Sequence, residues 1–317
     1  MKFLNTNEMS LGTASLLYNV RRMTRMLMPK QRFPLHDTAN VMQHPPILFV
    51  SAGRSGTTLL RSMLVAGGQI AIPPQSYVLC YATLQFQAMQ EQSWENLSRL
   101  VISLFEAHSE FERWDFDMSP VYQKAIELPQ AQRSLAAVIN LIYTQYAKQH
   151  FPSASYWGDQ SIENTVQIQW LAKTFPKAIY LHVLRDGRDV VASWVKQGKP
   201  LDGAIDQWLI ALDKVAYLER TLDVGQLIEV RYEDLVSDAP TTLSHLCGQI
   251  GLDFVDDMLD YWQKDTTVEH KYDAKLHGNL SKPVFNNTGR WKERLTEAQQ
   301  AHTIARLQDV LVEKGYA

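Results

Sequence analysis

Short apolar runs, each followed by a helical stretch, recur along the chain. The run over 47–50 leads through a glycine-containing turn into a helical pattern over 57–66, and 178–184 leads into a second one over 188–196. A third run, apolar apart from Glu229, occupies 227–230. Continuous apolar strands need cover on both faces, so their alternation with helices predicts an α/β fold with a parallel sheet flanked by helices.

A long helical region separates the first two of these units. Apolar residues recur at helical spacing within 77–150, among them Trp94, Leu97, Leu100, Val101, Leu104 and Phe105. We interpret this region as a helical insertion that covers the sheet and helps to form an acceptor pocket. The sequence has no internal repeat and no linker rich in Gly, Pro and Ser, so we predict one domain over 1–317.

The first residues combine apolar and basic side chains. Within 9–32, leucines and methionines are interspersed with Arg21, Arg22, Arg25 and Lys30. This pattern is typical of a basic amphipathic helix that packs on its own domain, the interpretation we favour, or lies on a membrane surface. No stretch reaches the roughly 18 uninterrupted apolar residues that a transmembrane segment needs.

The composition and net charge of the chain limit the kinds of ligand that it can bind. The net charge is -3, from 31 basic and 34 acidic side chains, so no overall basic field exists that would bind nucleic acid. The two cysteines, Cys80 and Cys247, are far apart and have neither disulfide-framework nor zinc-ligand spacing. We therefore expect no bound metal and a reducing, cytoplasmic location.

A loop with the properties of an anion site joins the first apolar run to its helix. Its residues are Ser51, Ala52, Gly53, Arg54, Ser55, Gly56, Thr57 and Thr58. The glycines permit a tight turn that points the N–H groups of the helix start toward a phosphate, the threonines add hydroxyl donors, and the arginine adds a permanent charge. A plain strand-to-helix turn also contains glycines, so the loop alone leaves both interpretations open.

The loop differs from that of nucleotide kinases. Those enzymes use GxxxxGK[ST], in which the lysine reaches the terminal phosphates and the hydroxyl holds magnesium. Here the spacing is shorter and no lysine precedes Thr57. A magnesium nucleotide site is therefore disfavoured, and a metal-free anion site is expected.

Two motifs in order resemble a known family. The stretch 53–64 resembles the 5′-phosphosulfate loop of sulfotransferases that use 3′-phosphoadenosine-5′-phosphosulfate (PAPS), in the branch with tyrosylprotein and bacterial enzymes. The stretch 183–193 is similar to the family's 3′-phosphate motif, in which an arginine at a strand end and a serine eight residues later bind one phosphate. Arg185 and Ser193 hold these positions. The carboxyl end of a parallel strand is where open α/β sheets bind ligands, whereas the alternative for this charged stretch is a pair of solvated salt bridges.

Two further segments resemble parts of the same nucleotide site. Tyr232 stands where relatives have a tyrosine near the adenine, although a buried tyrosine at a strand end would look the same. Arg290 and Lys292 match a loop that closes over the nucleotide, which makes them candidates for the 3′-phosphate; the alternative is two exposed cations at a helix start. The resemblance covers roughly 45–75 and 155–300 and implies a P-loop nucleotide-binding fold.

The acceptor side departs from the family pattern. Relatives carry either a glutamate shortly after an Ile-Pro-Pro segment or a lysine followed two residues later by a histidine, but this chain has Gln75 and Gln160 at the glutamate and lysine positions. An amide cannot take a proton at neutral pH. The ionisable alternatives nearby are Asp159 and Glu163, and His108 in the helical insertion is another.

We predict Asp159 as the base, although an aspartate at a strand end is as often a helix cap. Gln75 and Glu163 are expected to contact the acceptor. Gln160 and Arg54 are expected to act at the reacting centre, and Ser281 stands where the tyrosylprotein-like branch has a serine near the transferred group.

The resemblance implies transfer of the sulfuryl group of PAPS to a hydroxyl or amine, with release of 3′-phosphoadenosine-5′-phosphate (PAP). Such a transfer needs an in-line acceptor, donors to the equatorial oxygens and a base for the acceptor proton. The acceptor is a small molecule, carbohydrate, lipid or peptide. Two alternatives remain at this stage: a PAPS- or PAP-binding protein with weak or no transferase activity, suggested by Gln75 and Gln160, and a nucleotide kinase.

Overall fold

A five-stranded parallel sheet forms the centre of the molecule. The computed structural model describes residues 32–264 and 278–316. Within them the strands run in the order β2-β3-β1-β4-β5, and each pairs in parallel with its neighbour. Their bounds are β1 (Ile47–Phe49), β2 (Ile70–Ala71), β3 (Tyr156–Asp159), β4 (Ile179–Leu184) and β5 (Leu227–Arg231). The parallel α/β fold predicted from the apolar runs is confirmed.

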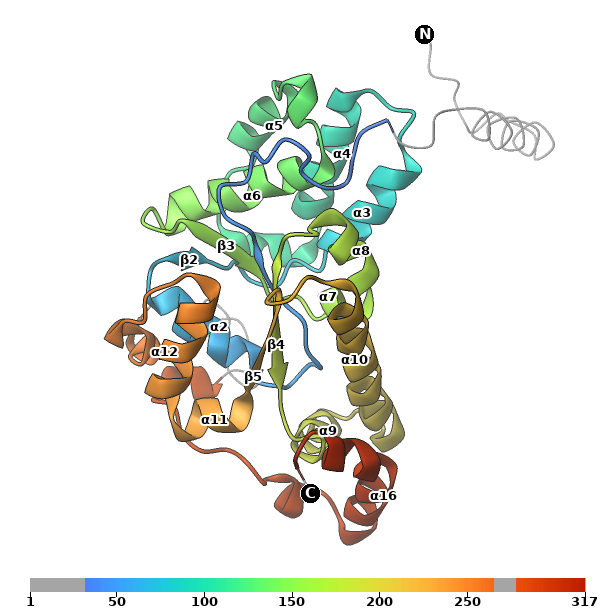
Figure 1. The fold of residues 1–317 in the computed structure, drawn as a ribbon, viewed down its shortest axis with the longest axis vertical. Helices are drawn as coiled ribbons and strands as arrows, with labels where there is room; N and C mark the ends of the chain where they lie inside the picture. The colour runs from blue at the N-terminus through green and yellow to red at the C-terminus, as the bar shows by residue number, and fades with distance from the viewer. Residues whose placement is uncertain (1–31, 265–277, 317) are drawn as a thin grey trace, which may run out of the picture.

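Helices cover both faces of this sheet (Figure 1). Along β1, Ile47 and Phe49 pack into a core with helices α2, α11 and α12, whereas Leu48 packs into a second core on the opposite face. The helices of the two layers are α2 (Thr57–Ala66), α7 (Glu163–Val166), α8 (Ile168–Thr174), α9 (Gly187–Lys196), α10 (Leu201–Thr221), α11 (Tyr232–Ser237) and α12 (Ala239–Ile250). A strand covered on both faces carries apolar residues at successive positions, which is the pattern that the sequence shows.

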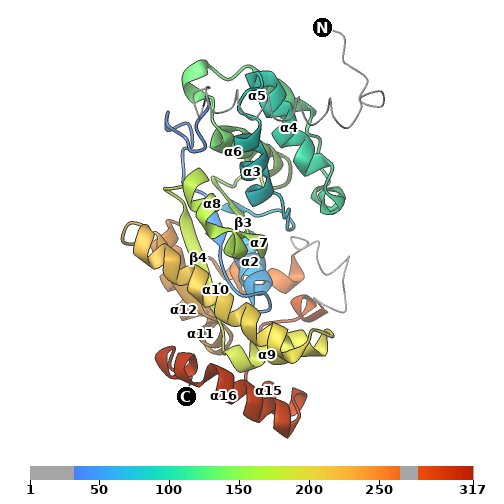
Figure 2. The ribbon, with the colours of Figure 1, turned by 90° about the vertical axis from the view of Figure 1, so that its right-hand side faces the viewer.

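The predicted helical insertion lies between β2 and β3. It contains α3 (Leu79–Ala88), α4 (Trp94–Glu106), the 3₁₀-helix η2 (Ser109–Trp114), α5 (Ser119–Ile126) and α6 (Leu135–His150). These helices gather at one end of the molecule, as both views show (Figure 1, Figure 2). The helical spacing of apolar residues in α4 buries Trp94, Leu97, Val101 and Phe105 against the neighbouring helices.

The C-terminal helices α15 (Trp291–Arg294) and α16 (Glu297–Glu313) lie at the opposite end, next to α9 (Figure 2). Between α12 and α15 the described chain contains three short 3₁₀-helices, η4 (Asp256–Met258), η5 (Tyr261–Gln263) and η6 (Gly278–Ser281). The segment after η6 returns to the carboxyl ends of β1 and β4, where it contacts Arg185.

Two expectations concern regions beyond the sheet. The basic amphipathic helix predicted within 9–32 falls almost wholly outside the described residues. No helix within the described ranges is both long and apolar enough to cross a bilayer. Cys80 and Cys247 are buried free thiols, which agrees with the absence of a disulfide framework.

Candidate donor and acceptor sites

The loop after β1 is shaped to leave the start of α2 free for an anion. Arg54 and Gly56 both have left-handed backbone angles, with φ of 75° and 97°. Gly56 is the N-cap of α2, has no side chain to cap it, and the first turn contains no acidic residue. The N–H groups of this turn therefore keep their partial positive charge for a ligand.

Glycine is required at two positions of this loop. A Cβ atom on Gly53 would lie 2.6 Å from the Trp194 ring, and one on Gly56 would lie 2.4 Å from the Tyr232 ring. Both distances are shorter than any contact that a real Cβ makes. The two aromatic rings thus pack directly on the loop backbone, and Trp194 Nε1 also donates to the Gly53 carbonyl at 3.1 Å.

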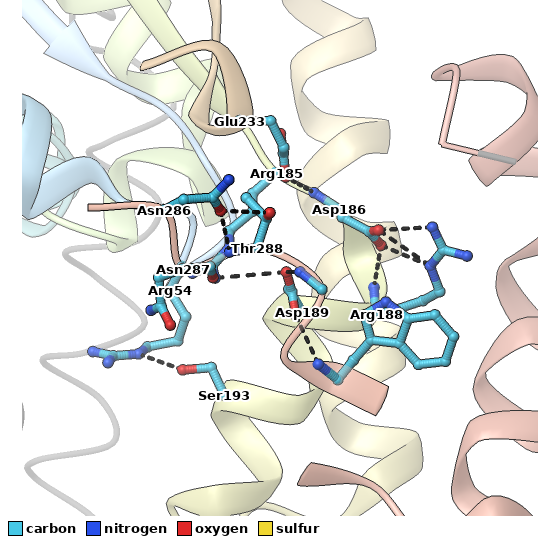
Figure 3. A network of polar contacts seen from close by, with 12 residues as sticks. Arg54, Arg185, Asp186, Arg188, Asp189, Ser193, Glu233, Asn286, Asn287 and Thr288 are labelled. Carbon is cyan, nitrogen blue, oxygen red and sulfur yellow. Dashed lines mark hydrogen bonds and ion pairs between the residues drawn. The ribbon is translucent and has the colours of Figure 1, made fainter. Parts of the chain in front are cut away.

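Arg54, Arg185 and Ser193 come together, as the two motifs predict (Figure 3). Arg54 Nε donates to Ser193 Oγ at 3.2 Å, and an Nη atom of Arg185 donates to the Arg54 carbonyl at 3.1 Å. Ser193 lies on α9 and Arg185 lies between β4 and α9. The two predicted phosphate-binding segments therefore form one continuous surface.

Arg185 is held in one orientation from several sides. Its guanidinium lies over the Tyr232 ring, 4.1 Å from the centre. One Nη atom donates to the Asn287 carbonyl at 3.0 Å and lies 3.8 Å from the carboxylate of Asp189. The Nε atom is buried and has no hydrogen-bond partner. Arg185 is thus oriented by the protein and retains a donor for a ligand.

A cavity of about 140 Å³ lies above the loop. It is lined from the loop and α2, from Arg185 and Tyr232, and from the segment after residue 278; the residues are Arg54, Gly56, Thr57, Thr58, Leu59, Arg185, Tyr232, Tyr261, Asn279, Leu280, Val284, Phe285 and Asn287. The lining combines charged and hydroxyl donors with aromatic and aliphatic side chains. This combination suits a nucleotide, whose phosphates are anionic and whose base is flat and weakly polar.

Asp189 fixes the segment that closes this cavity. Its carboxylate is fully buried and accepts the backbone N–H groups of Gly289, at 2.8 Å, and Trp291, at 2.9 Å (Figure 3). The segment that carries Arg290 is therefore attached to the start of α9. Burial and the charges of Arg290 and Arg185 lower the pKa of Arg294, so three guanidinium groups lie within electrostatic range of one another.

The charged residues that follow β4 form largely buried contacts within the protein. The alternative, that they form salt bridges exposed to solvent, does not describe them. Arg188 forms an ion pair of 2.7 Å with Asp186, in which each side chain is less than a fifth exposed. The same guanidinium lies over the Trp291 ring at 4.8 Å. The ring contact joins α9 to the C-terminal segment, and the ion pair orients the guanidinium at the start of α9.

Three predicted residues, Arg290, Lys292 and Ser281, are not among those that line the cavity. Arg290 and Lys292 are exposed; Arg290 pairs with Glu293 at 3.2 Å, and Lys292 lies near the Trp291 ring. Ser281 is exposed and directly follows Asn279 and Leu280, which line the cavity. Their contacts with donor or acceptor stay predictions.

The acceptor-side residues lie at the ends of β2 and β3. Gln160 is buried, and neither atom of its amide group has a partner. Gln75 Oε1 and Glu163 Oε2 are likewise buried and unpartnered. Burial and the neighbouring Asp159 raise the pKa of Glu163.

Asp159 has the contacts of a capping carboxylate. It is fully buried, and its oxygens accept from the Ser161 N–H at 2.9 Å, the Asn164 amide at 2.6 Å and the Tyr143 hydroxyl at 2.7 Å. The Ser76 hydroxyl is a fourth donor at 3.3 Å. Its assignment as the base stays a prediction, and the alternative of a cap accounts for each of these contacts.

Sequence reasoning missed three contributors to the donor site. Asp189 entered only through the alternative of solvated salt bridges, although its position four residues after Arg185 offered a signal of proximity. Arg294 is one helical turn beyond Arg290 and would have followed from the same periodicity. Asn287 contributes through its backbone carbonyl, for which a side-chain pattern carries no signal.

Comparison with known proteins agrees with this geometry. A family model described as "Sulfotransferase family" matches residues 45–257. Omega-hydroxy-beta-dihydromenaquinone-9 sulfotransferase Stf3 of Mycobacterium bovis and that of Mycobacterium tuberculosis are each 24% identical over 254 residues, which cover 67% of this chain. The chain spans 64% of the length of these curated relatives.

Two solved structures have a similar fold. The sulfotransferase domain of the Synechococcus PCC 7002 olefin synthase superposes with a TM-score of 0.56 and 20% identity, covering 89% of this chain and 96% of that one. The sulfotransferase domain from the curacin biosynthetic pathway gives a TM-score of 0.57 and 19% identity, covering 84% and 98%. At these identities the likeness concerns the fold. With a family model that matches more than half of its length, this chain belongs to the sulfotransferase family.

Proposed function

We propose that this chain transfers the sulfuryl group of PAPS to an acceptor hydroxyl or amine and releases PAP. The observation that carries the proposal is the cavity in which the start of α2, Arg185 and Tyr232 meet. It combines donors for two separate phosphates with an aromatic wall for a base. A single-phosphate site would not need the second arginine, which the protein orients at the cost of leaving its Nε atom unpartnered.

The residues present fit the donor. The N–H groups of the first turn of α2, with Thr57 and Thr58, would hold the 5′-phosphosulfate end, and Arg185 with Ser193 would hold the 3′-phosphate. Tyr232 would contact the adenine, and Arg290 and Lys292 would close over the nucleotide. PAPS supplies the sulfuryl group and a stable leaving phosphate. Arg54 and the loop amides offer positive charge where the leaving phosphate gains negative charge.

On the acceptor side, Gln160 is proposed to contact the transferred group, Gln75 to contact the acceptor and Ser281 to border the reacting centre. The curated relatives are named for an omega-hydroxy compound, which supports an alcohol as the acceptor. A cytoplasmic location and surface contact with membranes through 9–32 stay predictions.

The two other interpretations differ from the proposal in measurable ways. A nucleotide kinase would require magnesium and a loop lysine, and no lysine precedes Thr57. A PAP-binding protein without transferase activity would bind the nucleotide equally well and form no sulfate ester.

The direct experiment incubates the full chain with sulfur-labelled PAPS and a primary alcohol, with and without a metal chelator. We expect a labelled sulfate ester and PAP in both conditions. Binding of PAP without any ester, across alcohol and amine acceptors, would support the PAP-binding alternative. Tighter binding of magnesium-ATP than of PAP would favour the kinase.

A further inference from the structure

Buried polar atoms without partners gather around the nucleotide loop. Across 32–264 and 278–316, seven side-chain atoms are in this state, and five of them belong to Gln75, Gln160, Glu163 and Arg185. An unpartnered buried polar group is unfavourable, so its concentration in one region indicates that a ligand supplies the missing partners. Arg185 lines the donor cavity, and we infer that the other three residues face the acceptor.

Gln75 belongs to the segment after β2, and Gln160 and Glu163 belong to the segment after β3. The hydroxyl of Ser161 links the two segments. Ser161 Oγ accepts the backbone N–H groups of Ser76, at 3.1 Å, and Tyr77, at 3.2 Å. The segment that contains Gln75 is thereby fixed beside the turn that leads into α7, whose first residue is Glu163. These contacts are made by the loops at the ends of β2 and β3, and none of them involves a residue that lines the donor cavity.

Of the two carboxylates in this region, Glu163 has a free proton-accepting atom. Asp159 already receives four hydrogen bonds from the protein, whereas Glu163 Oε2 receives none. Glu163 is half-buried, and burial together with the charge of Asp159 raises its pKa. A carboxylate with a raised pKa is a stronger base than an exposed one.

Tyr77 forms a wall of the same site in a strained conformation. It has a φ of 55°, in the left-handed region that residues other than glycine seldom adopt, and such strain collects at functional sites. Its ring lies against His108 of the insertion, with the ring centres 5.7 Å apart. Burial first, and then the charge of Glu163, raises the pKa of Tyr77 to about 12, so the phenol stays protonated beside the carboxylate.

The charges that face this position are mainly acidic. Asp159 and Glu163 come from β3 and α7, and Glu110 comes from η2. Arg113 is also within range, but it forms an ion pair of 2.5 Å with Glu110. Tyr77 and Cys80, which also lie near these carboxylates, have pKa values raised to about 12 and are neutral. An anionic acceptor would be repelled from this position, whereas an uncharged one would not.

We propose that Glu163 is the general base of the reaction and that the ring pair of Tyr77 and His108 holds an uncharged alcohol against it. This inference rests on the proposed sulfuryl transfer. The alcohol proton moves to Glu163 Oε2 as the alcohol oxygen forms its bond to sulfur. The bond between sulfur and the 5′-phosphate oxygen breaks, and its electron pair stays on the phosphate of PAP.

The test compares Glu163→Gln with the wild-type chain on two acceptors, 1-dodecanol and 4-nitrophenol. The alcohol holds its proton strongly and needs a base, whereas the neutral phenol gives up its proton more readily and needs less help from one. We expect kcat with dodecanol to fall by about 10²- to 10⁴-fold, a much smaller fall with 4-nitrophenol, and an unchanged thermal shift with PAP. Equal losses on both acceptors, or no loss on either, would overturn the role of Glu163.

Glu112→Gln is the matched control, because it removes an exposed carboxylate from η2, the same 3₁₀-helix that carries Glu110. It should keep its turnover with dodecanol. Tyr77→Ala should raise KM for dodecanol more than it lowers kcat. If the wild-type chain binds PAP but sulfates neither acceptor, the proposed transferase function is wrong. If the wild-type chain sulfates both acceptors and Glu163→Gln does so equally well, the transferase function stands and only the role of Glu163 is wrong.

Stability gives a readout that is independent of turnover. Because the folded pKa of Glu163 is raised above its unfolded value, the unfolded chain loses this proton first as the pH rises. The folded state is therefore progressively destabilised from the unfolded pKa up to the folded one, and the loss persists above it. Glu163→Gln should raise Tm relative to the wild type at neutral pH and by less at mildly acidic pH. A Tm that falls at neutral pH would instead indicate a structural role.

Discussion

The Arg185 guanidinium lies over the Tyr232 ring at 4.1 Å, and the same ring packs on Gly56 of the nucleotide loop. One tyrosine therefore contacts both segments that are expected to bind the donor. Arg185 in turn donates to the carbonyls of Arg54 and Asn287. The loop, the end of β4 and the closing segment are fixed relative to one another through two side chains.

Replacement of Arg185 should reduce donor affinity selectively. Arg185→Ala removes one charge-assisted contact to the 3′-phosphate, worth on the order of 1.5 to 3 kcal/mol, or roughly tenfold to a hundredfold in Kd. The wild-type chain should prefer PAPS to adenosine-5′-phosphosulfate, which lacks that phosphate, and the variant should lose most of this preference. Competition binding with both nucleotides measures it, and a preference that survives in the variant would remove Arg185 from the 3′-phosphate site.

The loop glycine offers a matched pair of variants. Gly56 and Gly68 both have positive φ, of 97° and 74°, but a Cβ on Gly56 meets the Tyr232 ring whereas one on Gly68 meets nothing within 4 Å. Both alanine variants should lose about 1 kcal/mol of stability from backbone strain. Gly56→Ala should lose more, together with the thermal shift that PAP produces. Retention of full PAP protection in Gly56→Ala would show that the ring contact does not shape the site.

Asp189→Asn should disrupt the closing segment. The substitution leaves one acceptor oxygen and places an amide group against the second backbone N–H, so one buried hydrogen bond is lost at a cost of about 1 to 3 kcal/mol. We expect a lower Tm and weaker PAP binding. Asp213→Asn, at an exposed position of α10, is the control and should behave as the wild type. Unchanged PAP affinity in Asp189→Asn would show that the nucleotide does not depend on this segment.

Asp159→Asn separates a base from a cap. As the base, Asp159 would support turnover, and its loss would lower kcat by about 10²- to 10⁴-fold without a change in stability. As a cap that accepts four hydrogen bonds, it should instead lower Tm, because an amide presents its NH₂ group to donors. We expect the second result, together with a lower pKa for the acidic limb of the pH profile of kcat/KM, since Asp159 raises the pKa of Glu163. A large loss of kcat at unchanged Tm would support the sequence-based assignment.

The apolar runs were sufficient to predict the sheet and its main helices. Strands that are buried on both faces carry mostly apolar sequences, so β1 and β4 were found within one residue of their bounds. The bounds of β5 were found equally well, although its Glu229 is exposed. Strand β2 was missed because it has two residues, too few for any periodicity to emerge. The helix start at Thr57 was predicted correctly because the glycine-containing turn ends at Gly56 and the helical pattern begins at the next residue.

The donor site was more predictable than the acceptor site. Arg54, Arg185 and Ser193 lie in two compact motifs next to strand ends, and strand ends of a parallel sheet meet at one edge. The acceptor side depends on how the insertion folds over that edge. The pairing of Tyr77 with His108 joins residues that no short motif connects. Likewise, the four donors of Asp159 come from three segments, and their convergence follows from tertiary packing alone.

The two hydrogen bonds of Asp189 also bear on the order in which the molecule is made. The carboxylate belongs to the start of α9, and its partners, the amides of Gly289 and Trp291, follow about a hundred residues later. On the ribosome, the sheet and α9 emerge long before these amides do. A nascent chain that stops short of Gly289 has the buried carboxylate of Asp189 without these two donors. The segment that closes the cavity is therefore fixed only after Gly289 and Trp291 have been made, when all five strands have already left the ribosome.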